Sequence, residues 1–378
     1  MPHLSLLVSL AWVASVVACN PGGHAAVDSV ATPDGSLRAT TITRDLDTPW
    51  ELRLGPDGML WVSERGGRVS RVDPATGTRT TVGTVPGVLQ SGEGGLMGIA
   101  LHPRYPQEPW LYAMHTYAGP GFGARNRLVR ARVTNGQLGA PEVLLDGIPG
   151  SGIHDGSRLL FAADGFLYVT TGDASDAALA QDRRSLAGKV LRLTDTGQPA
   201  PGNPFGDAIW SFGHRNPQGL AQQPGTGALY VTEHGPGDND EVNRIDRGRN
   251  YGWPTVHGVC DDAQERAFCE ANAVAEPLVT WTPTIAPAGA VFYDATLIPG
   301  WRGSFLFVTL KEATLHRLVL SADGTRVTRS QEYFGGEFGR LRAIAVGARG
   351  ELYVATSNRD GRGSVATGDD RIIRIEPQ

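Results

Sequence analysis

The sequence predicts an all-β fold, a six-bladed β-propeller with four-stranded antiparallel blades. Three observations support this prediction. Glycine and proline account for 50 and 25 of the 378 residues, no long stretch has helical periodicity, and one turn-plus-strand motif recurs six times. Repeats of several strands per unit, spaced by roughly 45 to 75 residues, are typical of propellers.

Each copy of the motif is a turn followed by an aromatic strand. The copies end at Val62, surround Tyr112 in a degenerate form, and end again at Val169, Val231, Val308 and Val354. After most copies comes a second strand in which a basic residue stands between apolar ones, at residues 68–72, 189–193, 241–245, 315–318 and 371–375. Six copies predict six blades. A propeller lets so long a chain form one domain because each blade buries its faces against its neighbours.

The N-terminal residues differ from the rest of the chain. Residues 4–18 form an apolar run too short to span a bilayer comfortably, and small residues precede Cys19. Residues 1–19 resemble a bacterial lipoprotein signal with Cys19 as the lipidated residue. An ordinary cleaved signal would imply the same exported, periplasmic or cell-envelope location. Residues 20–38 are small and polar, as expected for a flexible tether, which leaves residues 39–378 for the propeller, the predicted catalytic domain.

The net charge of the chain and its two remaining cysteines indicate which partners to exclude and which compartment to expect. The net charge of −5 and the lack of basic clusters argue against a nucleic-acid or anionic-membrane surface, so membrane contact is expected only through the N-terminal lipid. Cys260 and Cys269 lie a short loop apart. In an exported protein such a pair predicts a disulfide rather than a metal site, because no further thiol or paired histidine accompanies it.

A histidine and an aspartate lie at opposite ends of a predicted hairpin. Residues 159–161 and 166–170 have strand patterns, and residues 163–165 carry turn chemistry. His154 and Asp173 therefore lie beyond the same end of the hairpin, close enough to touch. A histidine that removes a proton needs an acceptor on its other ring nitrogen, and a carboxylate supplies one. The pair is a candidate acid/base couple, although a surface histidine beside a turn aspartate is the commoner outcome for such a pair.

Two further groups of polar residues are not explained by the packing of a hydrophobic core. Arg340 and Arg342 point to one face of an extended segment, and with Arg215 and Lys311 they would form a cationic floor for an anionic ligand. Alone, two arginines would be a solvated strand face. The loop at residues 233–241 is crowded with oxygen ligands, which suits Ca²⁺ better than a transition metal.

Taken together, these segments resemble the soluble dehydrogenases of glucose and other aldoses that use pyrroloquinoline quinone (PQQ). The matching motifs run in family order over nearly the whole chain after residue 40: GEGGLMGIALHP (92–103), HDGSR (154–158), TTGD (170–173), IWSFGHRNPQG (209–219), EHGPGDNDEVN (233–243), NYGWP (250–254), PTIAPAG (283–289) and RLR (340–342). The family is a six-bladed propeller that binds PQQ, a planar tricarboxylate, on its central face.

The resemblance implies a role for each matching residue. His154 would be the general base and Asp173 its orienting partner. The quinone oxygens would meet Arg215 and Asn216, the carboxylates would meet Lys311, Arg340 and Arg342, and Thr284 would help to hold the ring. Glu93 and His234 stand at cofactor-contacting positions where the glucose enzyme has glutamines, and Ala343 replaces a frequent aspartate. Carbonyls of Gly235 and Pro236 would bind the Ca²⁺ that polarises the quinone, while Asp240, Glu241 and the Tyr251 carbonyl match a second, structural Ca²⁺ site.

The implied activity is PQQ- and Ca²⁺-dependent oxidation of an aldose at its anomeric carbon to the lactone. Electrons would pass to an external acceptor such as a quinone, a dye or a cytochrome, and the protein would be a monomer or a homodimer. Two alternatives stay open at this point. A non-catalytic binding propeller would be expected to lose the His154/Asp173 pair or the arginine pair, and a Ca²⁺-dependent lactone hydrolase would converge Asp, Asn and Glu side chains on one metal.

Overall fold

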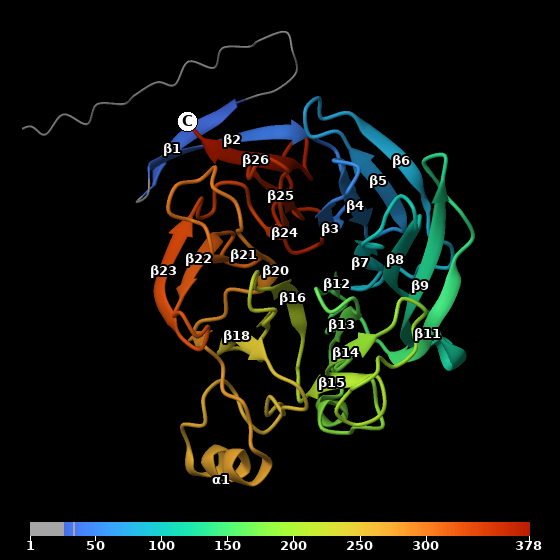
Figure 1. Cartoon of the computed structure of the whole chain (residues 1–378), viewed down its shortest axis with the longest axis vertical. Helices are drawn as coiled ribbons and strands as arrows, with labels where there is room; N and C mark the ends of the chain where they lie inside the picture. The colour runs from blue at the N-terminus through green and yellow to red at the C-terminus, as the bar shows by residue number, and fades with distance from the viewer. Residues whose placement is uncertain (1–25, 33–34) are drawn as a thin grey trace, which may run out of the picture.

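The computed structural model describes residues 26–32 and 35–378. Six antiparallel sheets follow one another around a central axis, each forming one blade (Figure 1). The fold class predicted from the repeat is therefore confirmed. The first strands of the blades, β3, β7, β12, β16, β20 and β24, neighbour one another in a closed ring around the axis.

Each predicted aromatic strand is the second strand of a blade, and each predicted basic strand is the third or its equivalent. Blade 1 contains β3 (Pro49–Leu54), β4 (Leu60–Glu64), β5 (Arg68–Val72) and β6 (Arg79–Thr84). Blade 2 contains β7 (Leu96–Leu101), β8 (Trp110–Ala118) and β9 (Ala124–Thr134), with both β10 (Gln137–Leu138) and β11 (Glu142–Pro149) paired to β9. Blade 3 contains β12 (Leu159–Phe161), β13 (Leu167–Thr171), β14 (Lys189–Leu193) and β15 (Ile209–Phe212).

The second half of the ring repeats this order. Blade 4 contains β16 (Pro217–Gln222), β17 (Leu229–Glu233), β18 (Asp240–Ile245) and β19 (Val279–Trp281). Blade 5 contains β20 (Pro287–Phe292), β21 (Phe305–Thr309), β22 (Leu315–Leu320) and β23 (Val327–Tyr333). Blade 6 contains β24 (Leu341–Val346), β25 (Leu352–Thr356) and β26 (Ile372–Pro377).

Strands from the N-terminal end complete blade 6. The backbone of β2 (Gly35–Thr43) pairs with β26, and β1 (Ala26–Thr32) pairs with β2. The tether predicted over residues 20–38 thus overlaps two strands. Their small polar residues gave no alternating pattern, and the strands form because the exposed edge of β26 offers unpaired backbone groups. Cys19 and the signal-like segment lie outside the described residues.

The recurring motif has a physical basis in the turn that precedes each aromatic strand. In blade 3 the Asp164 carboxylate accepts hydrogen bonds from the Tyr168 hydroxyl (3.0 Å) and from the Arg192 Nε on the next strand (2.9 Å). In blade 1 Asp57 likewise accepts a bond from the Trp61 indole (3.1 Å). One turn aspartate therefore ties the second and third strands of a blade together, which explains why turn, aromatic and basic residues recur together.

Apolar side chains pack between neighbouring blades. Between blades 2 and 3, for example, Tyr112, Leu159, Val169 and Leu191 are completely buried in one cluster. This packing makes the strands rigid supports for the loops at their ends.

The longest connection within a blade carries a helix. Between β18 and β19 lies α1 (Ala263–Asn272), capped by the Asp262 carboxylate, which accepts bonds from two backbone N–H groups. A disulfide joins Cys260 and Cys269, whose Cα atoms are 6.5 Å apart. Figure 1 shows α1 outside the ring of blades. Within the part of the chain that the structure describes, no helix is long and apolar enough to cross a membrane.

Candidate active site

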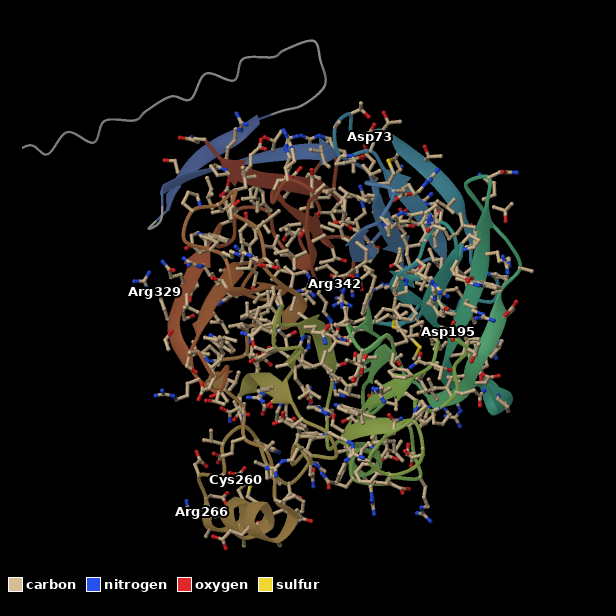
Figure 2. The ribbon with its side chains drawn as sticks, in the orientation of Figure 1. Asp73, Asp195, Cys260, Arg266, Arg329 and Arg342 are labelled. Carbon is tan, nitrogen blue, oxygen red and sulfur yellow. A yellow bond between two sulfur atoms is a disulfide. The ribbon has the colours of Figure 1, made fainter. Side chains whose placement is uncertain are left out.

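A cavity of about 400 Å³ opens at the centre of the ring. Loops from several blades line it, and Figure 2 shows Arg342 near the middle of the ring. The lining includes six of the residues predicted to contact a cofactor, namely Glu93, His234, Thr284, Lys311, Arg340 and Arg342. Gly235, Pro236 and Asp240 also line it.

His154 and Asp173 touch at one end of the β12–β13 hairpin. The His154 Nδ1 lies 2.8 Å from the Asp173 Oδ1, and Asp173 is buried. The other Asp173 oxygen accepts a bond from the Trp253 indole (2.9 Å), so the carboxylate is held from both sides. Because Asp173 occupies Nδ1, the neutral imidazole presents its Nε2 as a proton acceptor. Among the described residues this Nε2 has no hydrogen-bond partner, which is the arrangement a general base needs.

The backbone around His154 is held in an unusual conformation. His154 itself has φ of 63° and Ser157 has φ of 84°, in the left-handed region that costs a non-glycine residue about 1 to 3 kcal/mol. The Ser157 N–H is bonded to the Thr170 carbonyl and the Arg158 N–H to the Thr170 hydroxyl, so contacts with β13 fix the turn. This geometry directs the imidazole toward Asp173.

Arg215 and Asn216 follow β15 in the loop that leads into β16. Glu233 fixes this loop, because its carboxylate accepts bonds from the Arg215 backbone N–H and from the His214 imidazole (2.9 Å). The Arg215 guanidinium lies over the Trp253 ring at 5.3 Å, and its buried Nε has no partner among the described residues. The Asn216 Nδ2 is also buried without a partner among the described residues, while the Asn216 Oδ1 accepts a bond from the Gly156 N–H. Both donor atoms are buried, and neither residue is among those that line the cavity of about 400 Å³.

The predicted cationic floor is present, but its members are not equally free. The Arg340 Nε is 2.7 Å from the Asp360 carboxylate, and the Lys311 Nζ donates to the Thr284 hydroxyl at 2.7 Å. Arg342 has no hydrogen bond to any described residue and stacks on the Trp50 ring at 4.6 Å. Burial, and next to it the charge of neighbouring arginines, lowers the pKa of Arg342 to about 9. Of the three residues predicted to bind the carboxylates of a ligand, Arg342 is the one whose charge a bound anion would stabilise most.

The Trp50 ring carries a second cation on Arg158. The Arg158 guanidinium is 4.3 Å from the ring, completely buried, and paired with Glu51 at 2.6 Å. Trp50 is thus in contact with two guanidinium groups beneath the cavity. Arg158 is paired with Glu51, so of the two guanidinium groups on Trp50 only that of Arg342, which lines the cavity, is without a carboxylate partner among the described residues.

The carboxylate of Glu93 is neutralised where a glutamine was expected from the family. Its Oε1 lies 2.8 Å from the Arg362 guanidinium. Burial disfavours the charged form, but the charges of His234, Arg362 and Arg342 outweigh it and hold the pKa of Glu93 below its ordinary value. The His234 ring is fixed by the Pro287 carbonyl (2.8 Å), and burial lowers its pKa.

Several lining residues were missed from the sequence. Arg65, at the end of β4, lines the cavity with a guanidinium that makes no hydrogen bond or ion pair to any described residue. Asp360 and Arg362 enter from the loop after β25, and Trp50 from β3. The only available signal was position, because Arg65 directly follows a predicted aromatic strand and the NRDGR segment (358–362) directly follows another.

The proposed calcium ligands fall into two groups. Asp240 holds the Gly235 loop, since its carboxylate accepts bonds from the backbone N–H groups of Gly235, Ile285 and Ala286. Gly235 and Pro236 line the cavity, and the Asp240 carboxylate beside them is already occupied by backbone donors.

Glu241 and Tyr251 belong to the second group, behind the cavity. Glu241 lies directly across from Glu233 in the β17–β18 ladder, and both line a void of about 10 Å³ together with Tyr251. Burial, and next to it the Glu233 carboxylate, raises the pKa of Glu241 to about 8. Two carboxylates beside a void of atomic size are an arrangement that a cation would stabilise.

The comparison with known proteins agrees with this geometry. The family model described as Glucose / Sorbosone dehydrogenase matches residues 46–372. The chain belongs to the glucose/sorbosone dehydrogenase family. It is 31% identical to an aldose sugar dehydrogenase of Escherichia coli over 84% of this chain and 89% of the relative, and 35% identical to quinoprotein glucose dehydrogenase B of Acinetobacter calcoaceticus over 74% and 76%. The PQQ-bound form of an aldose sugar dehydrogenase from Streptomyces coelicolor superimposes with a TM-score of 0.80 at 39% identity, covering 92% of this chain and 99% of that one.

As a member of the glucose/sorbosone dehydrogenase family, the chain is a sugar dehydrogenase and hence an oxidoreductase. The site differs from that expected of a metal-centred hydrolase. Each carboxylate that lines the cavity is already engaged, Glu93 with Arg362, Asp360 with Arg340, and Asp240 with backbone N–H groups. The cavity therefore offers cations to a ligand rather than a cluster of free carboxylates.

Proposed function

We propose that this protein oxidises an aldose at its anomeric carbon to the lactone, with PQQ as its cofactor, Ca²⁺ as its metal and an external molecule as the final electron acceptor. The observation that carries the proposal is the His154–Asp173 pair, which has a free imidazole nitrogen and which the His154 backbone N–H links to Glu93, a residue that lines the central cavity together with several cations. A general base could not oxidise a sugar without a cofactor that accepts the electrons. A cationic cavity without a base could bind an anion but could not remove the proton of the sugar hydroxyl.

The residues present fit a planar tricarboxylate. The cavity volume of about 400 Å³ is within the range of small-molecule sites. Arg342 and Arg65 offer guanidinium groups without a carboxylate partner, and guanidinium pairs with carboxylate in a bidentate manner. The orphan donors on Arg215 and Asn216 suit quinone oxygens, because a buried donor left without a partner costs about 1 to 3 kcal/mol. Lys311, Arg340 and Thr284 complete the proposed contacts.

Calcium fits the oxygen ligands of the Gly235 loop. Gly235 and Pro236 would supply backbone carbonyls, and Ca²⁺ there would supply a Lewis acid for the quinone. Glu241 and the Tyr251 carbonyl would hold a second, structural Ca²⁺ in the adjoining void, whereas both oxygens of Glu233 already accept bonds from the loop at His214 and Arg215. For Asp240 we propose an indirect role, because its carboxylate is occupied by three backbone N–H groups.

The mechanism assigns the proton to His154. Its Nε2 removes the proton of the hydroxyl on the anomeric carbon as that carbon becomes a lactone carbonyl. Asp173 keeps Nδ1 protonated and stabilises the imidazolium that forms, while the Trp253 indole stops the carboxylate from rotating. PQQ, when bound, supplies the acceptor for the hydride that leaves the same carbon. The Arg215 guanidinium stabilises developing negative charge on oxygen.

The decisive experiment adds PQQ and Ca²⁺ to purified apoprotein and follows dye reduction with a panel of aldoses. We expect turnover by the wild type. His154→Gln should lose about 10²- to 10⁴-fold in kcat but should still shift the absorbance of bound PQQ. His102, which lines neither the cavity nor the void behind it, gives the histidine control His102→Gln. Cofactor binding without dye reduction by any aldose would instead identify a binding protein, and full activity of His154→Gln would refute the assigned base.

We also propose that residues 1–19 direct export and that Cys19 carries a lipid. The small residues before Cys19 support this proposal, and the segment lies outside the described residues. Metabolic labelling with palmitate tests it. The wild type should be labelled and Cys19→Ser should not, whereas an unlabelled, exported wild type would indicate a simple cleaved signal.

A further inference from the structure

Blade 5 carries a cluster of metal-ligating side chains away from the cavity lining. Glu312 lies in the turn between β21 and β22, His316 on β22, and Glu332 directly across from it on β23. One ligand atom of each residue, a ring nitrogen or a carboxylate oxygen, lies within 4.8 Å of the other two. The closest pair is the His316 Nε2 and the Glu312 Oε2, at 2.5 Å.

The histidine of this cluster is locked in place. His316 is completely buried, stacked on the Phe307 ring at 4.6 Å with an interplanar angle of 9°, and its ring meets the edge of Trp281 at 5.8 Å. Its Nδ1 is buried and has no partner among the described residues. The aromatic packing therefore fixes the imidazole, while its only hydrogen bond in the described part of the chain goes to Glu312.

The cluster contains more acidic than basic groups. Two carboxylates lie beside one imidazole, so even a protonated ring would offset only one of them. Glu312 is partly exposed and Glu332 is exposed, so both can adjust their side chains. A divalent cation would balance both carboxylates and let the histidine remain neutral, which is the form that binds metal.

We propose that Glu312, His316 and Glu332 form a binding site for a divalent transition metal of the Zn²⁺ type. Imidazole with two carboxylates suits Zn²⁺ better than Ca²⁺, which prefers oxygen ligands throughout. Zn²⁺ binds imidazole nitrogen and carboxylate oxygen at about 2.0 to 2.2 Å, which places tetrahedral ligands about 3.3 Å apart. To reach this spacing, the Glu312 oxygen would move away from the His316 Nε2, from which it is now 2.5 Å distant, and Glu332, now within 4.8 Å of both, would adjust its side chain. A water molecule would take the fourth position.

Such a metal would connect the edge of blade 5 to the central cavity. Glu312 follows Lys311, whose Nζ donates to the Thr284 hydroxyl at the cavity. A cation bound by Glu312 in the β21–β22 turn and by Glu332 on β23 would clamp the turn that presents Lys311. The metal site itself does not depend on the proposed cofactor.

Calorimetry on the full-length protein, with its disulfide intact and after treatment with EDTA, tests the site. Zn²⁺ should bind to the wild type, and Glu332→Gln, a near-isosteric change of an exposed side chain, should weaken the Kd at least tenfold. The matched control is Glu270→Gln, an exposed glutamate on α1, which should bind Zn²⁺ like the wild type. Equal affinity of the wild type and Glu332→Gln would overturn the proposal.

A second measurement covers the possibility that the variant is misfolded. Co²⁺ added to the wild type should give the intense visible absorption of a tetrahedral site, and excess Ca²⁺ should not remove it. No visible band, or a band that Ca²⁺ abolishes, would refute a transition-metal site. Because neither measurement involves PQQ or sugar, failure here leaves the proposed dehydrogenase activity untouched, and failure of that activity leaves the metal site untouched.

Discussion

Asp155, which follows the proposed base, makes a quantitative prediction about stability. Its carboxyl is 3% exposed, and one oxygen accepts bonds from the Asn126 amide (2.7 Å) and the Ser151 N–H (3.1 Å). The other oxygen is buried and has no partner among the described residues. Burial raises the pKa of Asp155 from 3.8 to about 7, because the ionised form would leave a charge on that oxygen unsolvated.

The size and sign of the effect follow from proton linkage. The folded protein keeps the Asp155 proton up to a pH of about 7, whereas the unfolded chain releases it near pH 4. Stability is therefore lost as the pH rises through this interval, and the loss is complete above it. At about 1.36 kcal/mol per pH unit, the interval from 3.8 to about 7 corresponds to about 4 kcal/mol. Asp155→Asn cannot ionise and avoids this loss.

The assay is urea unfolding of the wild type and Asp155→Asn between pH 4 and pH 8. The unfolding free energy of the variant, relative to the wild type, should rise by about 4 kcal/mol across this range. Asp176→Asn is the control, because Asp176 is exposed and its side chain makes no capping bond. A difference between Asp155→Asn and the wild type that stays constant within about 1 kcal/mol from pH 4 to pH 8 would refute the reasoning.

Three further predictions concern contacts around the site. Trp253→Phe removes the indole bond to Asp173, so kcat in the dye assay should fall by about tenfold, the equivalent of about 1.4 kcal/mol; an unchanged kcat would show that Asp173 needs no support from Trp253. Arg65→Gln should weaken PQQ binding about tenfold in a fluorescence titration by removing a free guanidinium from the cavity, and unchanged affinity would exclude contact. Lys189→Met should lower the free energy of unfolding by about 3 kcal/mol in urea, because the buried Nζ donates to three backbone carbonyls; a stability equal to that of the wild type would contradict this account.

The sequence predicted most of the fold because the repeat is a local property. The turn aspartate, the aromatic residue and the arginine of blade 3 lie within one pair of hairpins, so their contact shows as a motif. The contact between His154 and Asp173 was predictable for the same reason, since one hairpin connects them. The strands over residues 26–43 were not predictable, because β2 exists through pairing with β26 at the other end of the chain.

For the cavity as well, the sequence identified some of the lining residues but not the interactions among them. The chain order of motifs indicated Arg340, Arg342 and Lys311, but it could not tell which cations remain free. Asp360 neutralises Arg340 and Arg362 neutralises Glu93, and both come from a loop with no recognisable motif.

By itself, the sequence determined the repeat, the number of blades and the contact between His154 and Asp173, because these depend on residues close together in the chain. Only the tertiary structure decided which charges are balanced, which donors are left without partners and which residues meet at the centre. Closure of the ring brings loops from different blades to one axis. Burial near this axis shifts the pKa values of charged side chains such as Arg342. The same closure placed Arg65 in the cavity and packed His316 of blade 5 against Trp281 of blade 4.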